Sequence, residues 1–151
     1  KKWYHKVGVV YQNPDYQHFM PTVEKEIKFG AKSNEYADKI AAQFGVKHLY
    51  ARHPQSLSEG QKRRVSIAAV VATAPEVLIL DEPTVGQDYK GLCEMVEVLN
   101  CIHEETHNTM ITVTHDKRCA AALCDESVWI KDGKTYKTGK KELVDVFFSQ
   151  K

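Results

Sequence analysis

The chain has 151 residues, of which 42% are hydrophobic and 27% are charged, a balance typical of globular proteins and unlike that of disordered or fibrous chains. Its 21 basic and 20 acidic residues leave a net charge of +1, which gives no electrostatic reason to expect nucleic acid or an anionic membrane surface as a partner. The longest apolar stretch, residues 67–72, is far shorter than the roughly 18 residues that indicate a membrane-spanning helix. The four cysteines form no Cys-x-x-Cys pair, so we expect free thiols in a reducing cytosol.

The first part of the chain predicts one strand followed by helices and loops. Residues 7–11 (VGVVY) are short, β-branched and aromatic, as in a buried strand, and an Asn-Pro-Asp turn follows them. Helices are predicted over 22–29 and 33–44, because each begins at a hydroxyl residue that can cap it and ends at a glycine. We therefore expect a strand and turn at 1–14 and a helical subdomain at 15–60.

From Gln61 onward, helices alternate with short apolar strands. The expected order is a helix at 61–73, a strand at 77–80, a helix at 92–102, a strand at 110–114, a helix at 116–124, a hairpin of 127–131 and 135–138, and a helix at 142–148. This alternation favours an α/β core with a mostly parallel sheet over 61–139, followed by a C-terminal helix within 140–151.

The residues that open the helix at 61–73 favour anion binding. Ser58, Glu59, Gly60 and Gln61 place a small hydroxyl and a glycine at the point where free backbone N–H groups and the helix dipole favour negative charge. Gly60 would let a phosphate approach the backbone. Such a stretch standing alone is more often an ordinary helix cap.

Two adjacent carboxylates, Asp81 and Glu82, end the strand at 77–80. Ligands of α/β sheets bind at the carboxyl ends of strands, so one carboxylate can hold Mg²⁺ while the next faces a reacting water. Two acids after a strand are often a solvated turn, but both features at this spacing favour a nucleotide site over that interpretation.

These residues carry a resemblance to a known family. LSEGQ at 57–61, VLILDE at 77–82, ITVTHD at 111–116 and VGVVYQNPD at 7–15 resemble, in this order, the signature, Walker B, switch-histidine and Q-loop motifs of ATP-binding subunits of ABC transporters. The QNPD-x-Q-x-F variant at 12–19 is similar to the branch that contains cobalt and energy-coupling-factor vitamin importers. The resemblance implies ATP and Mg²⁺ as cofactors and the coupling of ATP hydrolysis to import of a vitamin or metal ion.

The resemblance also implies roles for the residues at the strand ends. Gln12 would contact Mg²⁺ or the attacking water, and its loop would transmit the nucleotide state to a membrane partner. Asp81 would organise Mg²⁺, Glu82 would polarise the water for in-line attack, and His115 would reach the γ-phosphate as the switch. Taken alone, Gln12 is a turn residue and His115 a buried histidine bonded to backbone.

A second group of residues would act across a dimer. Ser58, Gly60 and Gln61 would contact the γ-phosphate of ATP held by a second ATP-binding subunit, and Asp88 would lie at the interface between the two subunits. Transmembrane transporter subunits are the other implied partners, with no role for nucleic acid. The implied location is peripheral, on the cytoplasmic face of the cell membrane.

The chain departs from the family in one large respect, because it contains no Gly-x-x-x-x-Gly-Lys-Ser/Thr motif. Gly86 and Gly91 have the required separation, but Leu92 and Cys93 follow them. We expect a partial P-loop NTPase core plus the helical signature subdomain, incomplete because the Walker A region and a central strand are absent. On this hypothesis the chain is the C-terminal portion of a longer subunit, inactive alone and marginally stable because its sheet has an exposed edge.

Two smaller departures concern the signature and the D-loop. Glu59 replaces the first signature glycine, and Val85-Gly86-Gln87-Asp88 replaces the usual small-x-Leu-Asp. They are consistent with a branch variant or with the degenerate half of an asymmetric ATPase pair.

Other functions stay open at this point. One is a non-catalytic partner that supplies the signature motif in trans, and another is a DNA-repair type of ABC ATPase, although no sustained heptads appear. His103 and His107 match the H-E-x-x-H zinc hydrolase pattern, but the predicted helix ends near His107. The run Lys62-Arg63-Arg64 is interpreted as a solvated helix face rather than a nucleic-acid patch.

Overall fold

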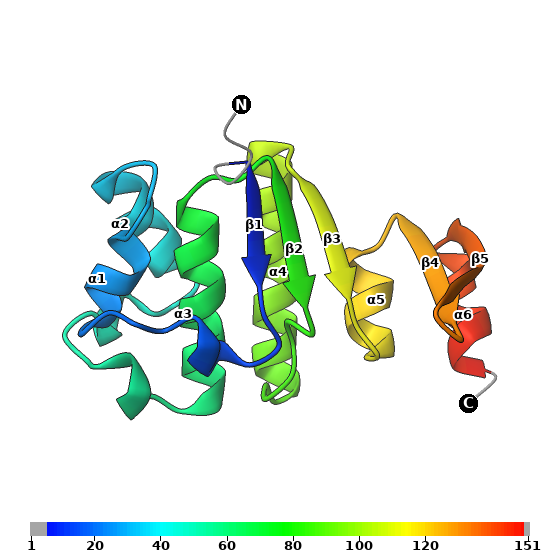
Figure 1. The fold of residues 1–151 in the computed structure, drawn as a ribbon, viewed down its shortest axis with the longest axis horizontal. Helices are drawn as coiled ribbons and strands as arrows, with labels where there is room; N and C mark the ends of the chain where they lie inside the picture. Colours follow the sequence, from blue (N-terminus) through cyan, green and yellow to red (C-terminus); the bar gives the residue numbers. More distant parts are fainter. Residues whose placement is uncertain (1–5, 150–151) are drawn as a thin grey trace.

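The computed structural model describes residues 6–149 and has three short parallel strands at its centre (Figure 1). The strands are β1 (Val7–Val10), β2 (Val77–Asp81) and β3 (Thr109–Val113), in the order β1-β2-β3. Val9 pairs with Ile79, which pairs with Ile111, so all three carboxyl ends meet at one edge of the sheet. The parallel α/β arrangement expected from the alternating pattern is confirmed.

The segment between β1 and β2 is helical. It contains α1 (Val23–Lys28), α2 (Asn34–Gln43) and α3 (Glu59–Ala72), with 3-10 turns at Pro14–Tyr16, Lys47–Leu49 and Pro54–Ser56. Thr22 and Ser33 cap α1 and α2 as predicted, since their hydroxyls accept bonds from the N–H groups of Lys25 and Tyr36. The helix α3 begins at Glu59, two residues before its predicted start.

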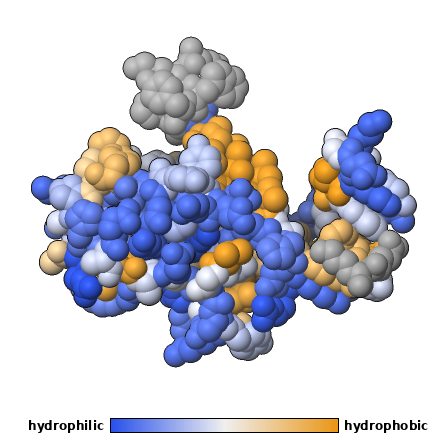
Figure 2. Space-filling view, turned by 60° about the horizontal axis from the view of Figure 1, so that its bottom comes forward, coloured by the Kyte–Doolittle hydropathy of each residue, from blue (hydrophilic) through white to orange (hydrophobic). Residues whose placement is uncertain are grey.

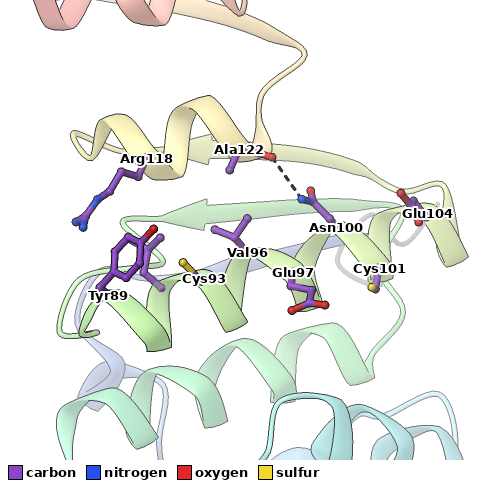
Figure 3. Close-up of a pocket in the computed structure, with 10 residues that line it drawn as sticks. Tyr89, Cys93, Val96, Glu97, Asn100, Cys101, Glu104, Arg118 and Ala122 are labelled. Carbon is purple, nitrogen blue, oxygen red and sulfur yellow. Dashed lines mark hydrogen bonds between the residues drawn. The ribbon is translucent and has the colours of Figure 1, made fainter.

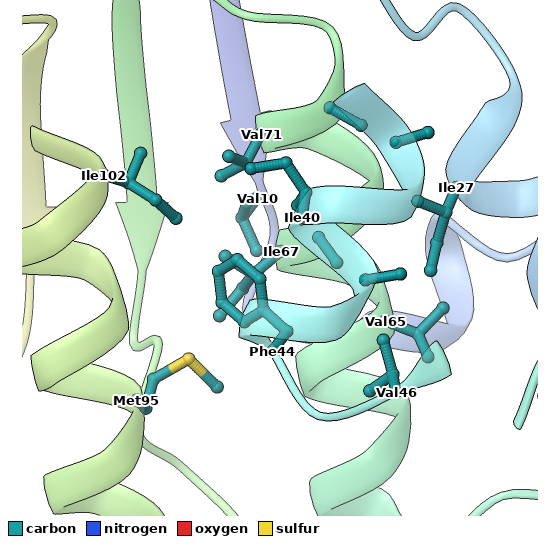
Figure 4. Close-up of a cluster of buried hydrophobic side chains, with 14 of the residues drawn as sticks. Val10, Ile27, Ile40, Phe44, Val46, Val65, Ile67, Val71, Met95 and Ile102 are labelled. Carbon is teal, nitrogen blue, oxygen red and sulfur yellow. The ribbon is translucent and has the colours of Figure 1, made fainter. Parts of the chain in front are cut away.

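The main core lies where these helices meet the sheet (Figure 4). Ile27 from α1, Ile40 and Phe44 from the α2 segment, and Ile67 from α3 are each at most 1% exposed. Burying such side chains stabilises a fold by about 1.5–3 kcal/mol each. This packing holds the helical segment against one side of the α/β unit.

Beyond β2, α4 (Tyr89–Thr106) and α5 (Lys117–Leu123) flank β3. The helix α4 is longer than predicted at both ends. Asp88 caps its start, and His107 adopts a left-handed conformation with φ of 51° just after its end. All four cysteines are free, in α4, in α5 or just after α5.

The hairpin predicted near the C-terminus is present, and it lies in a second sheet, separate from the three parallel strands. β4 (Glu126–Lys131) and β5 (Lys134–Lys140) form an antiparallel sheet of their own, and α6 (Glu142–Ser149) packs against it. In Figure 1 this unit lies to the side of β3, separated from it. Between residues 6 and 149, no helix combines the length and the apolar character needed to cross a bilayer.

The two faces of the central sheet are unequally covered. Leu78 and Leu80, which point to the face packed by helices, are fully buried. Ile111 and Val113 lie on the opposite face and are 48% and 55% exposed, and Val128 and Ile130 of β4 are each 59% exposed. Hydrophobic surface accordingly appears on both sides of the space between the hairpin unit and the rest of the molecule (Figure 2).

Candidate functional site

The ends of the three parallel strands gather the residues predicted to act on nucleotide. Gln12 follows β1, Asp81 and Glu82 lie at the end of β2, and His115 follows β3. Because neighbouring parallel strands end at the same edge, residues separated by more than 100 positions come together there. Asp81 and Glu82 are half-buried, whereas Gln12 and His115 are exposed.

Glu82 and His115 are in direct contact. The Nδ1 atom of His115 lies 2.6 Å from Oε1 of Glu82, and the backbone N–H of His115 donates to the same oxygen at 3.0 Å. Thr114 donates its hydroxyl to the other carboxylate oxygen at 3.2 Å. The Glu82 side chain is 12% exposed and that of His115 is 70% exposed, so a partly buried carboxylate is held beneath an accessible imidazole.

The backbone at Glu82 is strained. Its φ angle is 51°, in the left-handed region that costs an L-residue roughly 1–2 kcal/mol. The N–H of Glu82 donates to the carbonyl of Val113 at 2.9 Å, which holds this conformation against β3. Strain of this kind persists where surrounding structure determines it and is concentrated at functional sites.

The turn that carries His115 is fixed by the start of α5. Asp116 caps this helix by accepting bonds from the N–H groups of Arg118 at 2.8 Å and Cys119 at 3.4 Å. The Arg118 guanidinium beside it lowers the pKa of Asp116 to about 2. A permanent negative charge therefore stands next to His115.

The signature turn, residues 57–61, forms the start of α3. Ser58 accepts a bond from the N–H of Gln61, and the Gln61 side chain accepts one from the N–H of Ser58, so both side chains are used in a capping box. The N–H groups of Glu59 and Gly60 have no hydrogen-bond partner within the described chain. The capping box uses only acceptor oxygens of Ser58 and Gln61, so the Ser58 hydroxyl and the Gln61 side-chain amide can still donate. These two donors and the two backbone amides are the groups left to face an anion.

Gly60 also has a role that sequence reasoning missed. Its carbonyl accepts a bond from Nε2 of Gln87 at 3.0 Å, and a Cβ on Gly60 would lie 3.1 Å from that nitrogen and 3.4 Å from the carbonyl oxygen of Gly86. Glycine here lets the segment 85–88 approach the signature turn. No local signal could reveal this contact, because the partners are 27 residues apart.

The two departures from the family pattern are neighbours in space. Gly86, with φ of 79°, faces Glu59 so closely that a Cβ on Gly86 would lie 3.7 Å from the Glu59 Cβ. Asp88, in turn, uses its side chain to cap α4 through the N–H of Gly91 at 2.7 Å. The signature turn and the segment 85–88 therefore form one packed unit at the end of the molecule where the strands end.

The interpretation of Lys62-Arg63-Arg64 as a solvated face is wrong. Lys62 is 9% exposed and Arg63 is 3% exposed. Lys62 pairs with Asp15 at 2.7 Å, and Arg63 donates to the carbonyl oxygens of Tyr11 and Gln12. The cations are buried because their partners arrive from a segment about 50 residues away, which composition cannot indicate.

The zinc hydrolase alternative finds no support in the geometry. His107 lies beyond the last residue of α4, and Nδ1 of His103 bonds to the carbonyl of Asn108 at 2.8 Å. Nowhere in residues 6–149 do three or more potential metal-binding side chains gather.

A groove between α4 and α5 lies apart from these residues (Figure 3). It has a volume of about 450 Å³ and is lined by Tyr89, Cys93, Val96, Arg118 and Ala122, among others. No residue predicted to bind nucleotide lines it. The candidate site is an open sheet edge, and it is identified by the residues gathered there rather than by a pocket.

Comparison with known proteins places the chain among its relatives. The model of the family described as "ABC transporter" matches residues 1–85, more than half of the chain. The chain belongs to the ABC transporter family. The energy-coupling factor transporter ATP-binding protein EcfA2 of Enterococcus faecalis is 42% identical over 148 residues, which cover 92% of this chain and 51% of that protein. The chain thus spans about half the length of the curated relatives it matches.

Solved structures agree with the family assignment. CbiO1 of Clostridium perfringens, described as part of the ABC transporter complex CbiONQ, superposes with a TM-score of 0.82 at 33% identity, covering 97% of this chain and 61% of CbiO1. The ATP-binding cassette MJ0796, in a dimeric post-hydrolysis state bound to ADP and Pi, superposes with a TM-score of 0.78 at 25% identity, covering 90% and 63% of the two chains. The α/β fold is that of an ABC ATPase, represented here in part.

Proposed function

We propose that this chain is the signature- and Walker B-bearing part of an ATP-hydrolysing subunit that drives an ABC importer of the cobalt and energy-coupling-factor branch, with a vitamin or a metal ion as cargo. The observation that carries the proposal is the contact between Glu82 and His115 at the sheet edge that also holds Gln12 and Asp81. Phosphoryl transfer depends on positioning and charge neutralisation, and this edge offers both.

The residues present fit one side of a magnesium–nucleotide complex. Asp81 and Gln12 offer the hard oxygen ligands that Mg²⁺ prefers, and Glu82 can orient a water while His115 donates toward a phosphate. Bound Mg²⁺ would neutralise charge on the phosphates. The sequence contains no Walker A motif to cradle those phosphates, so we infer that another segment of the complete subunit supplies it.

The uncovered side of the sheet supports that inference. The outer edge of β3 pairs with no strand among residues 6–149, and Ile111 and Val113 are exposed beside it. A further strand placed between β3 and β4 would pair with that edge and cover apolar surface on both sides. We propose this as the place of the segment that carries the P-loop.

The partners we propose use two other surfaces. A second ATP-binding subunit would face the signature turn, where the amides of Glu59 and Gly60 are free to meet its nucleotide. A transmembrane subunit would dock beside the loop of Gln12, where exposed aromatic residues gather. These are Tyr11, Tyr16, Phe19 and Phe29, of which the last two pack edge to face with ring centroids 5.1 Å apart. On this proposal the subunit is peripheral and lies at the cytoplasmic face of the cell membrane.

Replacing the proposed catalytic glutamate tests the function. In the subunit assembled with its P-loop segment, Glu82→Gln should lower ATP turnover by about 10²–10³-fold, as loss of a general base does, with nucleotide binding retained. Glu97→Gln, at an exposed position of α4, is the matched control and should retain turnover. Turnover that survives Glu82→Gln would contradict the role of Glu82.

The non-catalytic partner remains as a second candidate, favoured by the acidic Glu59 at the signature turn. On this hypothesis the chain completes the ATP site of another subunit without hydrolysing ATP at its own strand edge. Gly60→Asp would then abolish turnover by the pair of subunits, while Glu82→Gln would leave it unchanged. The two substitutions together distinguish the candidates.

A further inference from the structure

Side chains of the first two turns of α3 bind the loop that follows β1. Lys62 pairs with Asp15 at 2.7 Å, and the hydroxyl of Ser66 lies 2.8 Å from Nε2 of His18. Between these contacts, Nη1 of Arg63 donates to the carbonyl oxygen of Tyr11 at 2.8 Å, and Nη2 donates to that of Gln12. One helix face thus holds the segment 11–18 through two backbone carbonyls, of Tyr11 and Gln12, and through the side chains of Asp15 and His18.

The position of Gln12 depends on these contacts with α3. Its side chain is exposed and makes no hydrogen bond to any described residue, so its place relative to Asp81 and Glu82 is set through its backbone. The carbonyl of Gln12 is held by Arg63, whose side chain is almost fully buried.

The charge of Arg63 also lies in the field of the acidic residues. Burial lowers the pKa of Arg63, and the carboxylates of Glu59, Asp81 and Glu82 oppose that effect. The guanidinium therefore bonds directly to the loop of Gln12 and lies within electrostatic reach of the signature turn and of the acid pair, Asp81 and Glu82.

We propose that Arg63 is a positioning residue that fixes Gln12 relative to the acid pair and ties the loop of Gln12 to the helix that begins at the signature turn. This inference rests on the proposed function. A guanidinium suits the task because its rigid fork reaches two successive carbonyls at once, whereas a lysine ammonium is a single point of charge on a flexible stem.

The test uses Arg63→Lys and Arg63→Gln in the subunit assembled with its P-loop segment. Misplacing a group that orients the water should act on the transition state, so we expect kcat to fall about tenfold or more in Arg63→Gln, with KM for ATP within about twofold of the original value. Arg63→Lys should recover part of the loss. Arg52→Gln is the matched control, because Arg52 is exposed and, among the described residues, its side chain hydrogen-bonds only to Ser56.

A double substitution separates positioning from general stability. If Arg63 acts through Gln12, the variant Arg63→Gln with Gln12→Ala should turn over no more slowly than Gln12→Ala alone. Multiplicative losses in the double variant, or a rise in KM equal to the fall in kcat, would overturn the proposal.

Amide hydrogen exchange over residues 11–18 gives a readout that needs no turnover. Exchange in this segment should accelerate in Arg63→Gln and not in Arg52→Gln. Unchanged exchange would overturn the tie between Arg63 and the loop. Absence of ATP turnover in the unsubstituted assembly would instead count against the proposed function, with exchange still deciding whether Arg63 holds the loop.

Discussion

The two outer edges of the central sheet differ in whether other residues hydrogen-bond to them. At the β1 edge, the side-chain amide of Gln17 takes the place of a neighbouring strand: its Nε2 donates to the carbonyl of Val9 and its Oε1 accepts from the N–H of Tyr11, both at 3.0 Å. At the β3 edge, no described residue pairs with the strand, and Ile111 and Val113 are about half exposed.

This difference shows that residues of the chain itself satisfy the backbone groups at the β1 edge but not at the β3 edge. An unpaired strand edge invites association, and proteins normally cover or interrupt it. The β1 edge is closed by a residue only seven positions beyond the strand, so it is finished locally. The β3 edge and the exposed apolar side chains of β4 across from it stay uncovered within residues 6–149, and we propose above that the P-loop segment covers them.

The largest expected effect is a loss of stability, and it should differ between a covered and an uncovered position of the sheet. Leu78→Ala should destabilise the chain by about 2–5 kcal/mol, because Leu78 is fully buried on the helix-packed face. Ile111→Ala should cost at most about 0.5–1 kcal/mol, because Ile111 is half exposed. Urea unfolding of both variants measures the contrast, and equal losses would show that the uncovered face is packed in solution.

Opening the β1 edge should have a smaller effect. Gln17→Ala removes two hydrogen bonds to the strand and should lower the free energy of unfolding by about 1–3 kcal/mol. Gln17→Glu keeps the oxygen that accepts from the N–H of Tyr11 but loses the donor to the carbonyl of Val9. The amide of Tyr11 should therefore exchange faster in Gln17→Ala than in Gln17→Glu. If Gln17→Ala leaves stability and exchange unchanged, the edge is not closed by this side chain.

A third expected effect is a pH dependence of stability in the loop that follows β1. Burial lowers the pKa of His18 to about 4, with Asp15 opposing and Lys62 adding to the shift. Because an unfolded histidine titrates near 6.5, the unfolded chain binds more protons between these values, and stability should fall as the pH drops from about 6.5 to 4. Urea midpoints across this range should fall less steeply in His18→Gln than in His48→Gln, a control at an exposed histidine.

Features that depend on near neighbours along the chain were predictable. Thr22 and Ser33 cap their helices as expected, and the apolar runs of β2 and β3 form parallel strands. The gathering of Gln12, Asp81, Glu82 and His115 followed from strand order alone, because parallel strands share one carboxyl edge. The strained backbone at Glu82 had no sequence signal, and it occurs where the N–H of Glu82 bonds to Val113 on the neighbouring strand.

By itself, the amino-acid sequence determined the elements, their alternation and the sheet edge at which the residues proposed to act on nucleotide gather, because caps and hydrophobic periods act over a few residues. Only the tertiary structure decided that Arg63 is buried against the loop of Gln12, that Gln87 binds Gly60, and that the hairpin lies apart from β3. Those outcomes depend on which distant segments meet, and on buried charges finding partners that local composition does not specify.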